Sequence, residues 1–217
     1  MLETTKPRTP RGPNAERRAS TRAKIMDAAV RCLTEFGYAA TSTPLVAKIA
    51  KVSRGSLLHQ FPTKEDLIIG VAEYASRACN AVMLQHLAPY PDGPERFLRG
   101  VDAVWASLQQ PEAIALMEVT VAARSDPELG ARYPGFADDL NAFLHRGRMR
   151  MAQNLDVPER VEEIDVLAHL TRAALNGLAM ETTFIGRSTE EALKVVALLK
   201  DMRQRLVDEL KPVGARG

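Results

Sequence analysis

The sequence is poor in the residues that build disulfide frameworks, metal centres and catalytic sites. Its only cysteines, Cys32 and Cys79, lie far apart and form no CxxC pair, which argues against a disulfide scaffold or a zinc site. The four histidines are scattered, and no HExxH, GxSxG or glycine-rich phosphate-binding motif occurs. We therefore expect a protein without a metal, a cofactor or enzymatic activity.

Long apolar runs are also missing. No uninterrupted stretch approaches the roughly 18 apolar residues of a membrane span, and the N-terminus lacks the apolar segment of a secretory signal. These absences predict a cytoplasmic protein. With 217 residues, 46% of them hydrophobic, the chain can bury a sizeable core.

The net charge of +2 is unevenly distributed. Residues 1–66 contain 12 Lys and Arg against 6 Asp and Glu, a balance of +6, whereas residues 67–217 contain 17 against 21, a balance of −4. A basic N-terminal third indicates a polyanionic partner for that segment, although solvated surface charge would give the same balance. Residues 1–19 combine prolines with five basic residues and are predicted to form a flexible basic arm, acting as a solubilising tail or contacting nucleic acid.

Three short helices are predicted after this arm. From Ser20 or Thr21, apolar residues recur at helical spacing until Gly37 ends the pattern. The stripe consists of Ile25, Ala28, Ala29, Cys32, Leu33 and Phe36. Ser42 or Thr43 can cap a second helix of about two turns, which has Pro44 in its first turn.

A third helix follows a turn of about three residues, the spacing of a helix-turn-helix. Ser53 can cap it, and Leu57 and Phe61 can anchor one face in the core. In a helix-turn-helix the N-terminal residues of the second of the two helices enter the major groove of DNA.

Read together, the motifs of this segment resemble the DNA-binding domain of the tetracycline-repressor (TetR) family of bacterial transcriptional regulators. They are Ile25-Met26-Asp27-Ala28-Ala29, Phe36-Gly37-Tyr38, Thr41-Ser42, Val46-Ala47, Val52-Ser53-Arg54-Gly55-Ser56-Leu57, His59-Gln60-Phe61 and Lys64-Glu65-Asp66-Leu67. The resemblance implies an all-α homodimer. It implies an N-terminal three-helix helix-turn-helix domain over residues 20–66, and a helical effector-binding and dimerisation domain over residues 67–217.

Roles for individual residues follow from helix position and from the resemblance. Arg54 is predicted to read guanine with its two-pronged guanidinium, or else to contact phosphate only. Gly55 allows close approach, and His59 and Lys64 match family positions that meet phosphates. The predicted DNA contacts are Thr43, Ser53, Arg54, Gly55, Ser56, Leu58, His59, Gln60 and Lys64.

The chain departs from the family pattern at Lys51 and Leu58. The family usually has glycine in the turn, where the backbone needs positive φ, and a non-glycine residue there costs about 1 kcal/mol. The family also usually has tyrosine in the middle of the recognition helix. Leu58 cannot donate that hydrogen bond to a phosphate, but it can touch a thymine methyl group.

Six further helices are predicted, the first from the cap at Thr63 to about Ala88, linking the two domains. The other five are placed at 94–109, 111–124, 134–154, 158–186 and 188–211. The last two are apolar on more than one face, which predicts a four-helix dimer interface or, alternatively, burial within one subunit. An effector cavity would be lined by Met83, Phe97, Trp105, Met117, Glu118, Phe143, His145, Asn176 and Met180.

The prediction is a ligand-responsive repressor, with a dimer bound to a palindromic operator until a small-molecule effector releases it. An activator, or a DNA-binding regulator that senses no small molecule, is the alternative.

Overall fold

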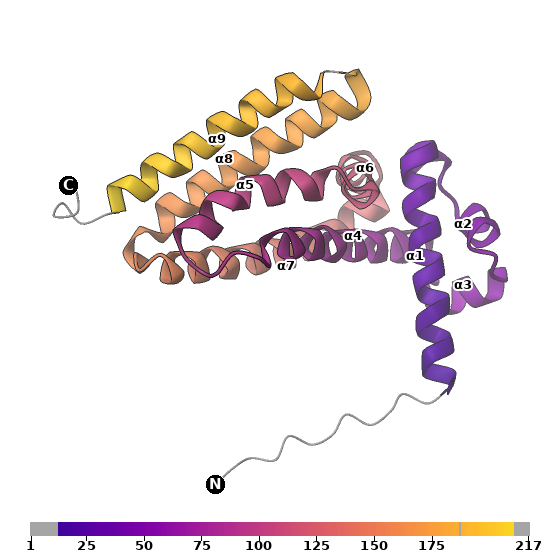
Figure 1. Cartoon of the computed structure of the whole chain (residues 1–217). Helices are drawn as coiled ribbons and strands as arrows, with labels where there is room; N and C mark the ends of the chain where they lie inside the picture. The colour runs from indigo at the N-terminus through magenta and orange to yellow at the C-terminus, as the bar shows by residue number, and fades with distance from the viewer. Residues whose placement is uncertain (1–12, 187, 211–217) are drawn as a thin grey trace, which may run out of the picture.

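The computed structural model describes residues 13–186 and 188–210, and all regular elements in this part of the chain are helices (Figure 1). The all-α fold class is therefore confirmed. In chain order the helices are α1 (Pro13–Ala40), α2 (Thr43–Ala50), α3 (Arg54–Gln60), α4 (Lys64–Leu87), α5 (Pro94–Leu108), α6 (Pro111–Ser125), α7 (Pro127–Asn154), η1 (Pro158–Arg160), α8 (Val161–Met180), η2 (Glu181–Ile185) and α9 (Thr189–Leu210).

Helix α1 begins earlier than predicted. A flexible arm was predicted over residues 1–19; residues 13–19 are helical, and the remainder of that arm lies outside the described residues. The apolar stripe starts only at Ile25, so the mostly exposed turns before it extend a helix that the core already stabilises. Gly37, with φ 74°, interrupts the helical geometry at the predicted place.

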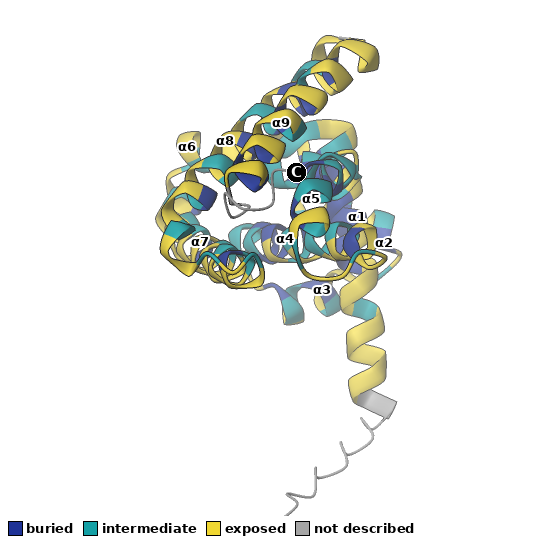
Figure 2. Ribbon diagram, turned by 60° about the vertical axis from the view of Figure 1, so that its left-hand side comes forward, coloured by how far each residue is buried: buried dark blue, intermediate teal, exposed yellow. Residues whose placement is uncertain are grey.

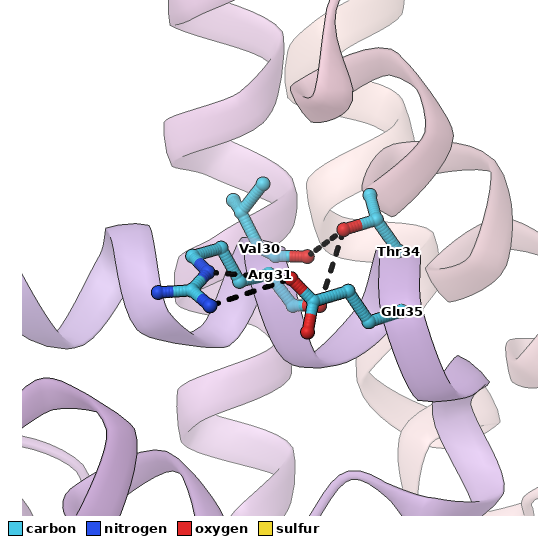
Figure 3. A network of polar contacts seen from close by, with 4 residues as sticks. All are labelled: Val30, Arg31, Thr34 and Glu35. Carbon is cyan, nitrogen blue, oxygen red and sulfur yellow. Dashed lines mark hydrogen bonds and ion pairs between the residues drawn. The ribbon is translucent and has the colours of Figure 1, made fainter.

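Local side-chain bonds support the exposed face of α1. The Thr34 hydroxyl donates to the carbonyl oxygens of Val30 and Arg31 at 3.0 and 3.1 Å, and the Arg31 guanidinium pairs with Glu35 at 3.4 Å (Figure 3). An exposed pair four residues apart contributes only about 0.3–0.5 kcal/mol. Arg31 is thus an ordinary surface residue of the same helix that carries the basic N-terminal turns.

The predicted start of α4 is confirmed in detail. The Thr63 hydroxyl accepts the Asp66 backbone N–H at 3.0 Å, and the Asp66 carboxylate accepts the Thr63 backbone N–H at 3.1 Å. This capping box satisfies two donors that a helix start leaves free. By length and composition α4 is also the one described helix that could span a membrane. Its apolar side chains instead contact α1, α5, α6 and α7.

Two boundaries in the C-terminal half differ from the prediction. Helix α7 begins at Pro127 rather than at 134, because the Asp126 side chain caps it by accepting the N–H groups of Glu128 and Leu129. Pro134 lies inside α7. The single helix predicted for 158–186 is a 3₁₀ turn, α8 and a π-helical turn that ends at Gly186, where φ is 75°.

Three groups of buried side chains hold the helices together. The largest joins α1, α2 and α3 to α4, α6 and the first half of α7, through residues such as Leu57, Leu67, Val119 and Leu129. The other two join α5 to α8 and α9, and the ends of α5, α7, α8 and α9. Packing is therefore continuous across residues 66 and 67, where the sequence analysis placed a domain boundary.

One charged side chain is buried between α5 and α9. Arg203 is 4% exposed, donates to the Phe97 carbonyl oxygen at 2.6 Å and lies over the Phe97 ring. A Cβ at Gly100 would lie 2.5 Å from its Nη1 atom, so glycine is needed to admit the guanidinium. Burial lowers the pKa of Arg203 to about 10. This arginine occupies a position that the apolar pattern of α9 did not reveal.

Candidate nucleic-acid interface

The α2–α3 unit is held in the geometry that the sequence analysis predicted. Ser42 caps α2 by accepting the Leu45 N–H at 3.4 Å, and Ser53 caps α3 by accepting the Ser56 N–H at 3.1 Å. Leu57 and Phe61 are buried in the core, as expected. Both ends of α3 are thus fixed, and Arg54, Gly55 and His59 are exposed.

Lys51 lies in the turn between α2 and α3 with φ 55° and ψ 42°, in the left-handed region. Its N–H bonds to the Lys48 carbonyl oxygen at 3.2 Å, and the next N–H, of Val52, bonds to Ala47 at 3.1 Å. These bonds close the end of α2 in the manner usually assigned to glycine. The requirement for positive φ at this position is therefore confirmed.

The predicted DNA contacts on α3 are largely free to meet a ligand. Arg54 is exposed and forms no hydrogen bond or ion pair with any described residue. A Cβ at Gly55 would meet no atom within 4 Å, so the protein's own packing does not require glycine there. Ser53 and His59 are exposed, and Thr43, Ser56 and Gln60 are half-buried.

Leu58 and Lys64 differ from Arg54 because both contact other parts of the protein. Leu58 is half-buried against the main core cluster. The Lys64 ammonium donates to the Tyr38 carbonyl oxygen at 3.4 Å and lies 4.0 Å from the centre of the Tyr38 ring. In this structure the Lys64 side chain contacts Tyr38 near the C-terminal end of α1 and does not join the exposed residues of α3.

Tyr38 links this region to the C-terminal helices, a role that the sequence gave no signal for. Its hydroxyl donates to the Asp126 carboxylate at 2.5 Å, and its backbone N–H donates to Glu118 at 3.2 Å. Burial, followed by the hydrogen bond to Asp126, raises the pKa of Tyr38 well above 10. The partners are 88 and 80 residues away in sequence, so only the fold brings them together.

A second link joins α4 to α7. The Asp66 carboxylate, which also closes the capping box, pairs with Arg132. The Thr63 hydroxyl bond lowers the pKa of Asp66 most, and Arg132 lowers it further. The N-terminal half of α7 is therefore tied to both ends of the segment that carries α2 and α3.

The nine effector candidates lie in different surroundings. Phe97 is buried beneath Arg203, Glu118 is bonded to Tyr38, and His145 is exposed on α7, 3.9 Å from Asp165. Met83, Trp105, Met117 and Asn176 are half-buried, whereas Phe143 and Met180 are exposed. Two surface grooves, of about 370 and 390 Å³, are lined by none of the nine.

Among the described residues, no three or more His, Cys, Asp or Glu side chains are grouped in a way that could hold a metal ion.

Comparison with known proteins identifies the helix-turn-helix. The family model described as "Bacterial regulatory proteins, tetR family" matches residues 25–71, which include α2, α3 and the start of α4. The transcriptional repressor AcnR of Corynebacterium efficiens is 26% identical over 192 residues, covering 86% of this chain and 94% of that protein. Residues 25–71 form a TetR-family DNA-binding domain. The chain that carries this domain is a DNA-binding transcriptional regulator.

A further regulator is similar in sequence, and solved structures share the fold. The regulator CymR of Pseudomonas putida is 35% identical over 118 residues, which cover 53% of this chain and 57% of CymR. A TetR-family regulator from Rhodococcus sp. has the same fold, with a TM-score of 0.64 at 16% identity over 84% of this chain and 97% of that one. The multidrug binding protein EbrR, solved with imidazole, has a TM-score of 0.54 at 21% identity over 96% of this chain and all of EbrR.

Proposed function

We propose that this TetR-family regulator is a ligand-responsive repressor, with a dimer bound to a palindromic operator until a small-molecule effector releases it. The observation that carries the DNA-binding part is the exposed N-terminal end of α3. Arg54 has no partner among the described residues, and Gly55 has open space around it. A guanidinium without an internal partner loses nothing within the protein when it binds a base.

Arg54 is assigned the base-reading role. Its guanidinium can donate two hydrogen bonds to the O6 and N7 atoms of guanine, worth about 1–3 kcal/mol of discrimination. Gly55 lets the helix approach the groove closely, and Ser53, Ser56, Gln60 and Thr43 supply polar contacts to bases or phosphates. His59 is assigned to a phosphate. Lys64 is assigned to a phosphate only if DNA draws its ammonium away from Tyr38.

The proposed division is a DNA-binding domain over residues 20–66 and an effector-binding and dimerisation domain over 67–217. Helix α4 crosses from one to the other, and Tyr38 and Asp66 bind the α6–α7 corner and α7. A displacement of α6 or α7 by an effector would therefore reach α1 and α4 directly. Two recognition helices must lie about 34–36 Å apart to read successive major grooves, so a small displacement is enough to lower affinity.

Dimerisation is proposed through α8 and α9. These helices expose a set of large apolar side chains, Val166, Leu170, Met180, Leu193, Leu198 and Met202. Gly177 lies on α8 with no atom within 4 Å of its Cβ position, which leaves room for close helix approach. Effector release draws support only from relatives, since AcnR is named a repressor and EbrR a multidrug binding protein. An activator, or a regulator without an effector, remains the alternative.

Selection of bound sites from random DNA, repeated with a panel of metabolites, tests the operator, its symmetry and its release together. We expect an inverted repeat whose binding is lost with one class of metabolite. Arg54→Ala should relax base preference at one position of each half-site, whereas Lys48→Ala, which removes a charge from α2, should leave base preference unchanged. Selected sites without two-fold symmetry, or an Arg54→Ala protein with full discrimination, would contradict the assignment.

A further inference from the structure

The N-terminal turns of α1 form a basic surface outside the segment that the family model covers. Residues 15–24 contain Arg17, Arg18, Arg22 and Lys24 against one acidic residue, Glu16. All of them are exposed except Thr21, which is half-buried. The family match starts only at residue 25. Figure 2 shows these turns projecting from the body of the molecule.

Two of these arginines lie on the face of α1 that is directed toward the recognition helix. Ile25 and Ala29 face the core of the helix-turn-helix and are fully buried. Positions three and seven residues before Ile25 lie on the same helix face, and they are Arg22 and Arg18. The face of α1 that is apolar from Ile25 onward therefore carries arginines in the turns before Ile25.

Contacts with α3 confirm this placement. The Arg22 guanidinium lies 4.5 Å from the centre of the Phe61 ring, at the C-terminal end of α3. The Arg18 Nη2 atom lies 2.9 Å from His59 Nε2. The basic turns are thus continuous with the surface that carries the proposed DNA contacts.

The hydrogen bond between Arg18 and His59 also fixes how His59 can act. A guanidinium only donates, so the Nε2 atom of His59 must accept, and the ring proton must then be on Nδ1. His59 is exposed. Its Nδ1–H is consequently the group that is left to donate to a phosphate oxygen.

We propose that residues 15–24 extend the DNA-binding surface along the phosphate backbone beside each half-site, with Arg18 positioning His59. The inference rests on the assignment of α3 as the recognition helix. Phosphates are favoured over bases because these side chains are separate cations on the outside of a helix, and because α3 already presents the groups suited to the major groove. Ten helical residues span about 15 Å, enough to reach phosphates beyond those that α3 can contact.

The test is the salt dependence of operator binding, measured by fluorescence anisotropy on the selected site between 50 and 200 mM salt. Each lost phosphate contact should reduce the slope of log Kd against log salt by about 0.9. Arg18→Gln should lower this slope by that amount and weaken binding about three- to tenfold, since His59 loses its positioning as well. Arg17→Gln and Lys24→Gln test the remaining surface in the same way, and thermal melts verify that each variant folds.

Arg31→Gln is the matched control. It removes the same charge from the same helix, but Arg31 is paired with Glu35 of α1 (Figure 3). We expect its slope to match that of the unaltered protein. If Arg31→Gln lowers the slope as much as Arg18→Gln, only net charge matters and the proposal is wrong. If Arg18→Gln changes base preference and leaves the slope intact, the segment reads bases and the backbone assignment is overturned.

A double-mutant cycle tests the positioning role. Arg18→Gln and His59→Gln should be less than additive in operator affinity, because Arg18→Gln also removes the positioning on which the His59 phosphate contact depends. Fully additive effects would show that Arg18 does not act through His59. An Arg54→Ala protein with unchanged specificity would instead show that α3 itself was misassigned, which separates failure of this proposal from failure of the proposed function.

Discussion

Lys51 occupies a backbone conformation that glycine adopts without strain and that L-amino acids with a Cβ avoid. Nothing in the fold requires its side chain, which is exposed and forms no ion pair with a described residue. The ammonium of Lys51 is therefore available for a phosphate contact between α2 and α3, which is the role that we propose for it.

Lys51→Gly should raise the free energy of unfolding by about 0.5–1 kcal/mol, since glycine relieves the left-handed strain. The same change should weaken operator binding if the ammonium meets a phosphate. Thermal melts and anisotropy titrations measure the two effects separately. Lys51→Ala is the control, because it removes the charge and keeps the strain; a gain in stability for Lys51→Ala would contradict this explanation.

At the scale of elements, two carboxylates join the α6–α7 region to the DNA-binding segment. Asp126 caps α7 and accepts from Tyr38, and Asp66 caps α4 and pairs with Arg132. Backbone N–H groups of α7 lower the pKa of Asp126 most, and the Tyr38 hydroxyl lowers it further. Both carboxylates thus close a helix start and join two elements at once.

Acid should weaken these links in a predictable direction. Because the folded pKa of Asp66 lies below its unfolded value of 3.8, its contribution to stability is complete above that pH and is lost as the pH falls through the lower folded value. Asp66→Asn should lower the free energy of unfolding at pH 7 by about 1 kcal/mol, through the cap and the charged bond. It should also flatten the decline below pH 4, as measured by urea denaturation across pH.

Asp138→Asn serves as the comparison for this prediction. Asp138 is an exposed residue of α7 that forms no hydrogen bond or ion pair with any described residue. We expect its stability and its acid profile to match those of the unaltered protein. An acid profile for Asp66→Asn as steep as that of the Asp138→Asn protein would refute the role of Asp66.

At the scale of the whole molecule, the apolar surface is distributed unevenly. The core-facing stripe of α9 includes Val196, Leu199 and Leu206, whereas Leu193 and Leu198 on the same helix are about half exposed. Helix α8 divides in the same way, with Ile164 and Leu175 buried. An isolated subunit would leave this second face in water, and it is the face through which we propose that the dimer forms.

Leu170→Asp should convert the protein to monomers at micromolar concentration, because the carboxylate would be buried without a partner in a dimer. Leu170 is 43% exposed on α8, so the variant should still fold as a monomer. Light scattering coupled to gel filtration measures the mass. Val121→Asp is the control, since Val121 is 62% exposed on α6, and a dimer that persists in Leu170→Asp would show that the interface lies elsewhere.

Local signals in the sequence were sufficient for the helix-turn-helix. The serine caps, Pro44, the interruption at Gly37 and the Thr63–Asp66 capping box depend on neighbours within a few residues, and each is found as predicted. The same holds for the burial of Leu57 and Phe61 and for the positive φ at Lys51. The sequence by itself therefore determined the all-α class, the TetR-family DNA-binding domain and the exposed end of α3.

Only the tertiary structure decided what depends on distant residues. The pairing of Tyr38 with Asp126, the burial of Arg203 and the dispersal of the effector candidates arise from helices far apart in sequence. Proline at 134 suggested a helix start, but the cap at Asp126 placed that start earlier. The basic turns of α1 were expected to be flexible because they bury nothing, yet they continue a helix that the core already stabilises. Composition indicates how much apolar surface a segment can bury, whereas the tertiary structure determines which residues that segment contacts.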